Sequence, residues 1–166
     1  MIPPMPSSIR SGRTAIRFDS PQQEIFLSLW RTYDRLRMLE DDLFSRFGLT
    51  AQQYNVLRQL RSEFPQSLPT LTLANRLVSR APDITRMLDK LERRSLVIRE
   101  RLPGNRRVVQ VRLGEPGLEL LEQLSDPVKQ CHEQQLGHLT EEQLKLLGEL
   151  LRQARLPHEE DDSHWH

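Results

Sequence analysis

Hydrophobic side chains recur every three or four positions over most of the chain, which predicts a largely helical protein. The first amphipathic segment covers residues 21–48, with Pro21 in its first turn and Gly48 at its end. Thr50 and Gln53 then form a capping-box pattern, which predicts that a second helix begins there.

The middle of the chain changes from a helical to a β pattern. A brief helix is expected from residue 73 to residue 77 or 78, and a longer basic helix begins near Ser79, a good N-cap, with Pro82 in its first turn. Residues 96–113 contain two alternating or β-branched runs around a Pro-Gly-Asn turn, which is typical of a hairpin. Two helices followed by a hairpin predict a winged helix-turn-helix.

Helical periodicity resumes after the hairpin. Pro127 is expected to kink the long helix or to begin a new turn of it, and Thr140 with Gln143 repeats the capping-box pattern. These helices contain more leucine side chains than a small winged helix can bury. We therefore expect residues 21–48 and 114–156 to pack against a second copy of the chain in a two-fold homodimer.

Charge is distributed unevenly along the sequence, although the net charge is only +1. Residues 75–112 contain 11 Lys and Arg against 4 Asp and Glu, a net +7, whereas residues 113–166 contain 4 against 12, a net −8. A compact basic segment beside an acidic one is expected of a nucleic-acid-binding module joined to a part that stays away from phosphates. The alternative is that these charges simply lie on solvated helix faces.

These patterns predict a fold that is mainly α with a small β-hairpin wing (α+β). The expected organisation is a disordered arm over 1–20, an N-terminal dimerisation helix over 21–48, a DNA-binding winged helix-turn-helix over 49–113, C-terminal dimerisation helices over 114–156, and a disordered tail of acidic residues and histidines over 157–166.

Other classes of protein find little support in the sequence. Apolar runs are too short to span a membrane, and the N-terminus lacks an apolar stretch of signal-peptide length, so a cytoplasmic protein is expected. The lone Cys131 lies in an apolar stripe and is interpreted as a buried structural thiol, with redox sensing as the alternative. The sequence has no phosphate loop, catalytic triad or zinc-ligand spacing, so we expect no enzyme activity, no cofactor and no metal.

The order of elements and several local strings resemble the MarR family of bacterial winged-helix transcriptional regulators. The matching strings are Leu49-Thr50 with Gln53-Tyr54 and Leu57, then Leu73-Ala74 with Leu77, then Thr85-Arg86 with Leu91-Glu92 and Leu96-Val97, and finally Asn105-Arg106-Arg107 with Leu113 and Gly117. The resemblance implies a dimeric regulator that binds double-stranded DNA at a pseudo-palindromic operator, acts as a repressor, and is released by a small ligand.

Three positions depart from the family pattern. Asn105 stands where an aspartate usually braces the wing, and Gly114 stands where a threonine is usual. Ser95 replaces a glycine, so it must either accept a left-handed conformation or cap its helix differently. Asn105 and Ser95 keep an alternative open, a winged-helix protein-interaction module that has lost specific DNA binding.

The expected DNA-binding residues lie in the basic helix and in the wing. They are Ser79, Arg80, Pro82, Asp83, Thr85, Arg86, Lys90, Arg99, Arg101, Arg106 and Arg107. We expect Arg86 to contact a base edge or a phosphate, the alternative being an internal salt bridge with Asp83 or Asp89. Asp83 is expected to orient a neighbouring arginine, and one of the two wing-tip arginines to enter the minor groove. Arg99 and Arg101 are expected to be phosphate contacts or solvated edge charges.

The resemblance also implies a crevice for a small aromatic effector between the dimerisation helices and the DNA-binding lobe. Trp30, Tyr33, Arg37 and Tyr54 are its candidate lining residues, with core packing as the alternative for the aromatic side chains.

Overall fold

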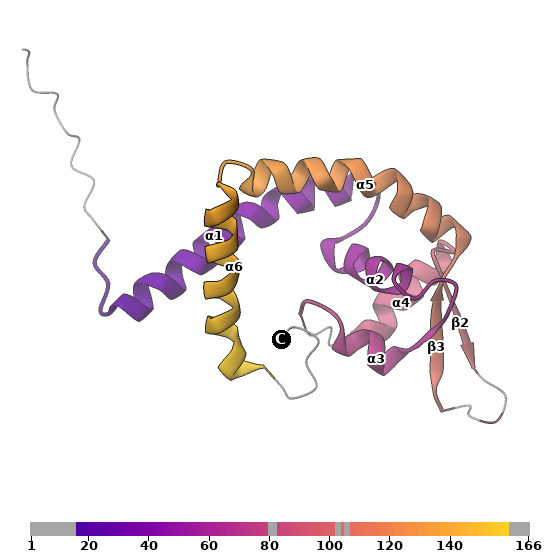
Figure 1. The fold of residues 1–166 in the computed structure, drawn as a ribbon. Helices are drawn as coiled ribbons and strands as arrows, with labels where there is room; N and C mark the ends of the chain where they lie inside the picture. Colours follow the sequence, from indigo (N-terminus) through magenta and orange to yellow (C-terminus); the bar gives the residue numbers. More distant parts are fainter. Residues whose placement is uncertain (1–15, 80–82, 102–103, 105–106, 160–166) are drawn as a thin grey trace, which may run out of the picture. The chain divides into compact units, whose positions relative to one another are not determined.

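The computed structural model describes residues 16–79, 83–101, 104 and 107–159. Its elements are α1 (Pro21–Ser45), α2 (Ala51–Arg61), β1 (Leu68–Pro69), α3 (Thr70–Asn75), α4 (Ile84–Arg93), β2 (Val97–Arg101), β3 (Val109–Leu113), α5 (Glu115–Leu136), α6 (Glu141–Arg155) and the 3-10 turn η1 (Leu156–His158) (Figure 1). The protein is mostly helical with a small antiparallel sheet, which confirms the predicted fold class.

The chain divides into two units, residues 1–35 and residues 36–166, and the division falls inside α1. In the first unit, the Ser20 hydroxyl accepts a hydrogen bond from the Gln23 amide at 3.1 Å and caps the start of α1. Phe26 and Trp30, one turn apart on α1, meet edge to face with ring centroids 6.4 Å apart.

Both predicted capping boxes are present in the second unit. The Thr50 hydroxyl accepts from the Gln53 amide at 3.2 Å, and the Gln53 side chain accepts from the Thr50 amide at 2.9 Å. Thr140 and Gln143 make the same pair of bonds at the start of α6. Each box satisfies two backbone donors that the helix itself cannot pair, which explains why α2 and α6 begin where the sequence predicted.

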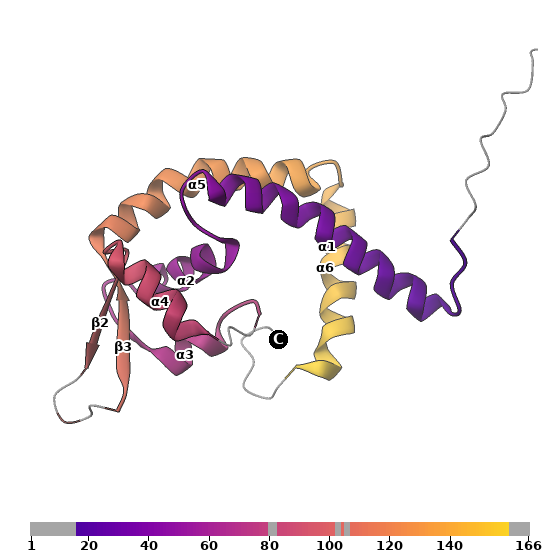
Figure 2. The same ribbon diagram turned by 180° about the vertical axis from the view of Figure 1, so that it is seen from behind.

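The core of the second unit forms where the helix-turn-helix packs on the sheet. The largest fully buried side chains are Leu57, Leu60, Leu73, Leu88, Leu91, Leu113, Leu124, Val56, Val97 and Val111. The strand order is β1-β3-β2 and every pairing is antiparallel, with Val97 opposite Leu113 and Arg101 opposite Val109. Strands β2 and β3 form the predicted hairpin, which we call the wing (Figure 2).

Several helix boundaries and one strand differ from the sequence predictions. The first helix ends at Ser45, and the residues up to Gly48 form a turn. The third helix runs over Thr70–Asn75, earlier than expected, and β1 just before it was not predicted, because two residues are too short to show alternation. The fourth helix begins at Ile84, so the prediction that Ser79 is its N-cap was wrong. Asp83 caps it instead, because its carboxylate accepts from the Arg86 amide at 3.3 Å.

Helix α5 begins in close contact with the turn that joins α4 to β2. A Cβ placed on Gly117 would lie 2.2 Å from the Leu96 carbonyl oxygen, and one on Gly114 would lie 2.4 Å from the Ser95 carbonyl oxygen. No larger residue fits at either position without backbone movement, so Gly114 suits this packing. Helix α5 continues through Pro127 as a single element.

Candidate nucleic-acid interface

Helix α4 presents a row of positive charges to solvent. Arg86, Lys90 and Arg93 follow one another at intervals of four and three residues, so they share one side of the helix, and all three are exposed. We call this row the cationic face. Leu88 and Leu91 are buried on the core side. Helix α4 is thus held by its apolar side while its charges stay accessible.

A second row on α4 is negative and is neutralised by the wing. The Arg99 guanidinium on β2 lies 2.6 Å from the Asp89 carboxylate and 2.5 Å from the Glu92 carboxylate. Its hydrogen bonds hold the pKa of Glu92 below its usual value, and the same bonds raise the pKa of Arg99. Two carboxylates that would repel phosphate are therefore paired within the protein.

Of the two roles expected for Arg99, the solvated edge charge was wrong, since its side chain is only 23% exposed and its guanidinium pairs with the two carboxylates. The sequence contained a usable signal for this. In a strand, Arg99 shares a face with Val97, and Val97 is buried, so Arg99 had to point toward the body of the protein and the acidic row of α4.

The N-terminal end of α4 brings Asp83 and Arg86 together. Besides capping the helix, the Asp83 carboxylate lies 3.7 Å from the Arg86 guanidinium. This is the internal salt bridge that the sequence left open as an alternative. The Arg86 side chain nevertheless remains 77% exposed, so the pair orients the arginine without covering it.

The other expected contact residues fall into two groups. Ser79, Thr85, Arg101 and Arg107 are exposed. Arg80, Pro82 and Arg106 lie outside the described residues. Elsewhere in the wing, the Arg112 guanidinium on β3 lies 3.3 Å from the Glu100 carboxylate on β2. The charge of Arg112 is therefore paired within the wing.

Comparison with known proteins identifies this arrangement. The sequence profile of the MarR family matches residues 49–109, which contain the helix-turn-helix and most of the wing. A MarR transcription factor from Planctomyces limnophilus is 55% identical in sequence, and its crystal structure matches with a TM-score of 0.66 over 84% of this chain and 99% of that one. The chain belongs to the MarR family.

Two further relatives carry informative names. The transcriptional repressor MprA of Escherichia coli is 27% identical over 87% of this chain and 84% of its own length. A mutant of MarR from Escherichia coli, solved in complex with operator DNA, is 25% identical, with a TM-score of 0.71 over 82% of this chain and 99% of that one. This MarR-family chain is therefore placed among DNA-binding transcriptional regulators.

The structure decides between the two alternatives for Ser95, a left-handed conformation or a different helix cap. Its φ is +57°, so this MarR-family chain places a serine in the left-handed conformation at the end of α4. The Ser95 amide donates to the Glu92 carbonyl at 2.8 Å, and the Leu96 amide donates to the Leu91 carbonyl at 3.0 Å. These bonds satisfy the last carbonyls of the helix and offset the cost of the conformation.

The candidate effector residues have different surroundings. Tyr54 stacks on Phe44 with ring centroids 4.5 Å apart, and burial raises the pKa of its hydroxyl, as expected for core packing. Arg37 pairs with Asp41 at 3.1 Å on the surface of α1. Trp30 and Tyr33 belong to the first unit, and both are more than 60% exposed, so core packing within this chain does not describe them.

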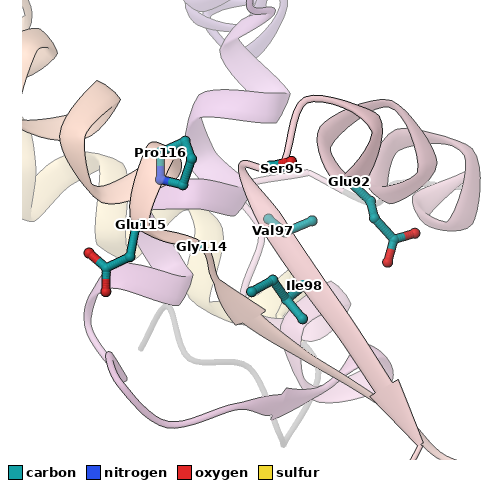
Figure 3. A pocket seen from close by; sticks show the side chains of 7 residues that line it. All are labelled: Glu92, Ser95, Val97, Ile98, Gly114, Glu115 and Pro116. Carbon is teal, nitrogen blue, oxygen red and sulfur yellow. The ribbon is translucent and has the colours of Figure 1, made fainter.

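A pocket of about 410 Å³ lies where the wing meets α5 (Figure 3). Val97, Ile98 and Pro116 contribute apolar surface to it. Glu92 and Glu115 also line it, but Figure 3 shows their carboxylates pointing away from each other. They therefore do not form a shared cation site.

Cys131 is buried on α5, as the structural interpretation expects, and burial raises the pKa of its thiol. A raised pKa leaves less of the reactive thiolate, which argues against redox sensing. Among the described residues, no group of three or more His, Cys, Asp or Glu side chains could hold a metal ion. Within the same residues, no helix is long and apolar enough to cross a membrane.

Proposed function

We propose that this protein is a homodimeric, sequence-specific repressor that binds a pseudo-palindromic operator and responds to a small aromatic effector. The observation that carries the proposal is the neutralisation of Asp89 and Glu92 by Arg99 beside an exposed cationic face. Because the helix keeps its positive charges accessible and pairs its negative ones internally, its field toward DNA is attractive.

The dimer is supported by apolar side chains that stay exposed in the described part of one copy. Helix α6 has no buried residue, and Leu146 and Leu150, one turn apart, are 60% and 54% exposed. In the first unit, Ile25 and Phe26 are more than 60% exposed. A second copy of the chain would remove these surfaces from water, which is favourable by about 25 cal/mol per Å² of apolar area.

In this proposal each copy places α4 in a major groove, and the wing tip lies beside it near the minor groove. Two recognition helices of one dimer then contact half-sites about 34 Å apart. Repression is steric, because the bound dimer occupies DNA that the transcription machinery needs. The repressor name of the relative MprA supports this direction of control. An effector that changes the separation of the two DNA-binding lobes would release the operator.

The test is selection of bound duplexes from a random pool at two salt concentrations, with the mass of the protein in solution measured in parallel. Recovery of a pseudo-palindrome by a dimer is the expected result. Binding that is salt-sensitive but blind to sequence, or no binding, would contradict the proposal. It would favour the alternative of a winged-helix interaction module.

The same selection separates the roles of two exposed arginines. Arg107→Ala should weaken binding to all sequences and reduce the salt slope by about 1, as expected for one lost phosphate contact. Arg86→Ala should alter the selected sequence, as expected for a residue near the base edges. If neither variant differs from the wild type, the proposed reading surface is wrong.

A further inference from the structure

The C-terminal end of α4, which is the recognition helix of the proposed function, is fixed in position by packing and by hydrogen bonds. Leu91, in its last turn, is 0% exposed, and Leu96, just beyond it, is 4% exposed. The Leu96 amide closes the helix on the Leu91 carbonyl at 3.0 Å. Arg94 lies between these two anchors, so the position of its backbone is set by the core.

From this fixed position Arg94 reaches back to the end of α1. Its guanidinium donates to the Gly48 carbonyl at 2.6 Å and to the Phe47 carbonyl at 3.1 Å. Both carbonyls belong to the turn that follows α1, which ends at Ser45, and a guanidinium donor makes a charge-assisted hydrogen bond to each of them. Gly48 has a φ of +65°, which belongs to the tight turn that follows α1. One side chain thus joins the ends of two helices that are separated by more than 40 residues in sequence.

The neighbouring Arg93 differs in this respect. It is exposed and belongs to the cationic face, and its side chain makes no hydrogen bond or ion pair with the described residues. The acceptors that Arg94 uses in the same part of the structure are backbone carbonyls rather than carboxylates. The two hydrogen bonds of Arg94 therefore depend on the position of the backbone in the turn after α1, and not on the conformation of an acidic side chain.

We propose that Arg94 is a positioning residue that couples the end of α1 to the recognition helix, so that a displacement of α1 changes the orientation of α4 on DNA. The effect on DNA rests on the proposed function. The contact lies within the second unit, so it concerns the part of α1 that follows residue 35 and the turn after it.

The first arm of the test measures DNA preference. Arg94→Met keeps the apolar stem but removes both hydrogen bonds, and Arg93→Met removes the same charge one position away. We expect Arg94→Met to lower the ratio of affinities for the selected and a scrambled duplex by roughly 2- to 30-fold, the range for a residue that carries coupling between sites. Arg94→Lys retains the charge and can bond to one carbonyl at a time, so its ratio should fall between Arg94→Met and the wild type.

The matched control should behave differently. Arg93→Met should reduce the salt slope while preserving the ratio of affinities, whereas Arg94→Met should leave the salt slope unchanged. An equal loss of preference in both methionine variants, or no loss in Arg94→Met, overturns the coupling. Because Arg94→Lys keeps the charge, it provides the same comparison if Arg94→Met proves unfolded in a thermal melt.

The second arm needs no DNA. Amide hydrogen exchange should become faster both in the turn at residues 46–49 and in the last turn of α4 in Arg94→Met, and in neither segment in Arg93→Met. Unchanged exchange in both segments overturns the proposal. If the wild type binds no DNA, the proposed function fails, while this arm still decides whether Arg94 couples the two helices.

Discussion

At the scale of single residues, the recognition helix depends on side chains that do not lie on its cationic face. Ser95 ends the helix in a conformation that few residues other than glycine adopt readily. Arg99 removes the charge of two carboxylates from the helix surface. Both residues act on the interface through the conformation and field of α4.

Ser95→Gly should stabilise the protein by about 1 kcal/mol, because glycine adopts a positive φ without the steric cost that a Cβ brings. The midpoint of urea denaturation measures this gain. Ser62→Gly is the matched control, since Ser62 caps α2 with a φ of −64° and should lose stability on the same change. A Ser95→Gly variant no more stable than the wild type would show that the serine is unstrained.

Arg99→Met should weaken DNA binding, because it leaves Asp89 and Glu92 charged and unpaired beside the cationic face. Adding Asp89→Asn and Glu92→Gln to the same chain should restore most of the lost affinity. A duplex titration at fixed salt measures all three proteins. If Arg99 instead contacted a phosphate, the triple variant would remain weak and its salt slope would be smaller by about 1.

Acid should weaken the contact between the wing and α4. Hydrogen bonding from Arg99 lowers the pKa of Glu92 in the folded protein, so its contribution to stability is complete above the unfolded value of about 4.3 and is lost as the pH falls through the lower folded value. Denaturation curves at about pH 7 and about pH 3 should differ less for Glu92→Gln than for the wild type. Equal differences would show that this carboxylate is not the titrating group.

At the scale of elements, the wing and α5 are positioned by a single turn. The Gly114 amide donates to the Leu96 carbonyl at 3.0 Å, and Gly117 lies against the same carbonyl. This turn also ends the recognition helix, α4. The wing, α4 and the first turn of α5 therefore meet at one place. A change there should be felt by all three elements.

Gly117→Ala should destabilise the protein by about 3 kcal/mol, since its new Cβ would lie 2.2 Å from a backbone oxygen that cannot move independently of the turn. Gly148→Ala in α6 is the control. Apart from its chain neighbours and the backbone of its own helix, no described atom lies within 4 Å of a Cβ at that position, and alanine should add roughly 0.5–1 kcal/mol of helix stability. Thermal unfolding of both variants measures the contrast, and a tolerated Gly117→Ala would mean that α5 can shift.

At the scale of the whole molecule, a single copy is incomplete in its apolar packing. The exposed leucines of α6 and the exposed aromatic residues of α1 lie outside the core that the helix-turn-helix forms with its sheet. In the proposed regulator, the exposed apolar surfaces join the two copies, and they are separate from the surface of α4 that contacts DNA.

Leu150→Glu should shift the protein from dimer to monomer, because it places a charge within the apolar surface of α6. Light scattering at several concentrations measures the change, and affinity for the selected duplex should fall with it. Gln153→Glu introduces the same charge three residues away at an already polar position and serves as the control. A Leu150→Glu protein that remains dimeric would place the interface elsewhere.

Much of the fold follows from local sequence patterns. The periodicity of apolar residues predicted the helices and the β-hairpin, and the capping boxes at Thr50 and Thr140 fixed two helix starts correctly. The basic segment of residues 75–112 also contains all three residues of the cationic face. Such features depend on residues a few positions apart, so the sequence alone was sufficient for them.

Other features depend on residues that are distant in sequence and were decided only by tertiary structure. Strand β1 exists because Leu68 pairs with Val111. Arg94 meets the Phe47 and Gly48 carbonyls because packing places the end of α4 beside the turn after α1. The role of Arg99 likewise required the wing to fold back onto α4. Composition and periodicity determine which charged and polar side chains lie on each element. Packing determines how far such a side chain lies from an acceptor on another element. Ion pairs and hydrogen bonds depend on that distance, so only the tertiary structure decides them.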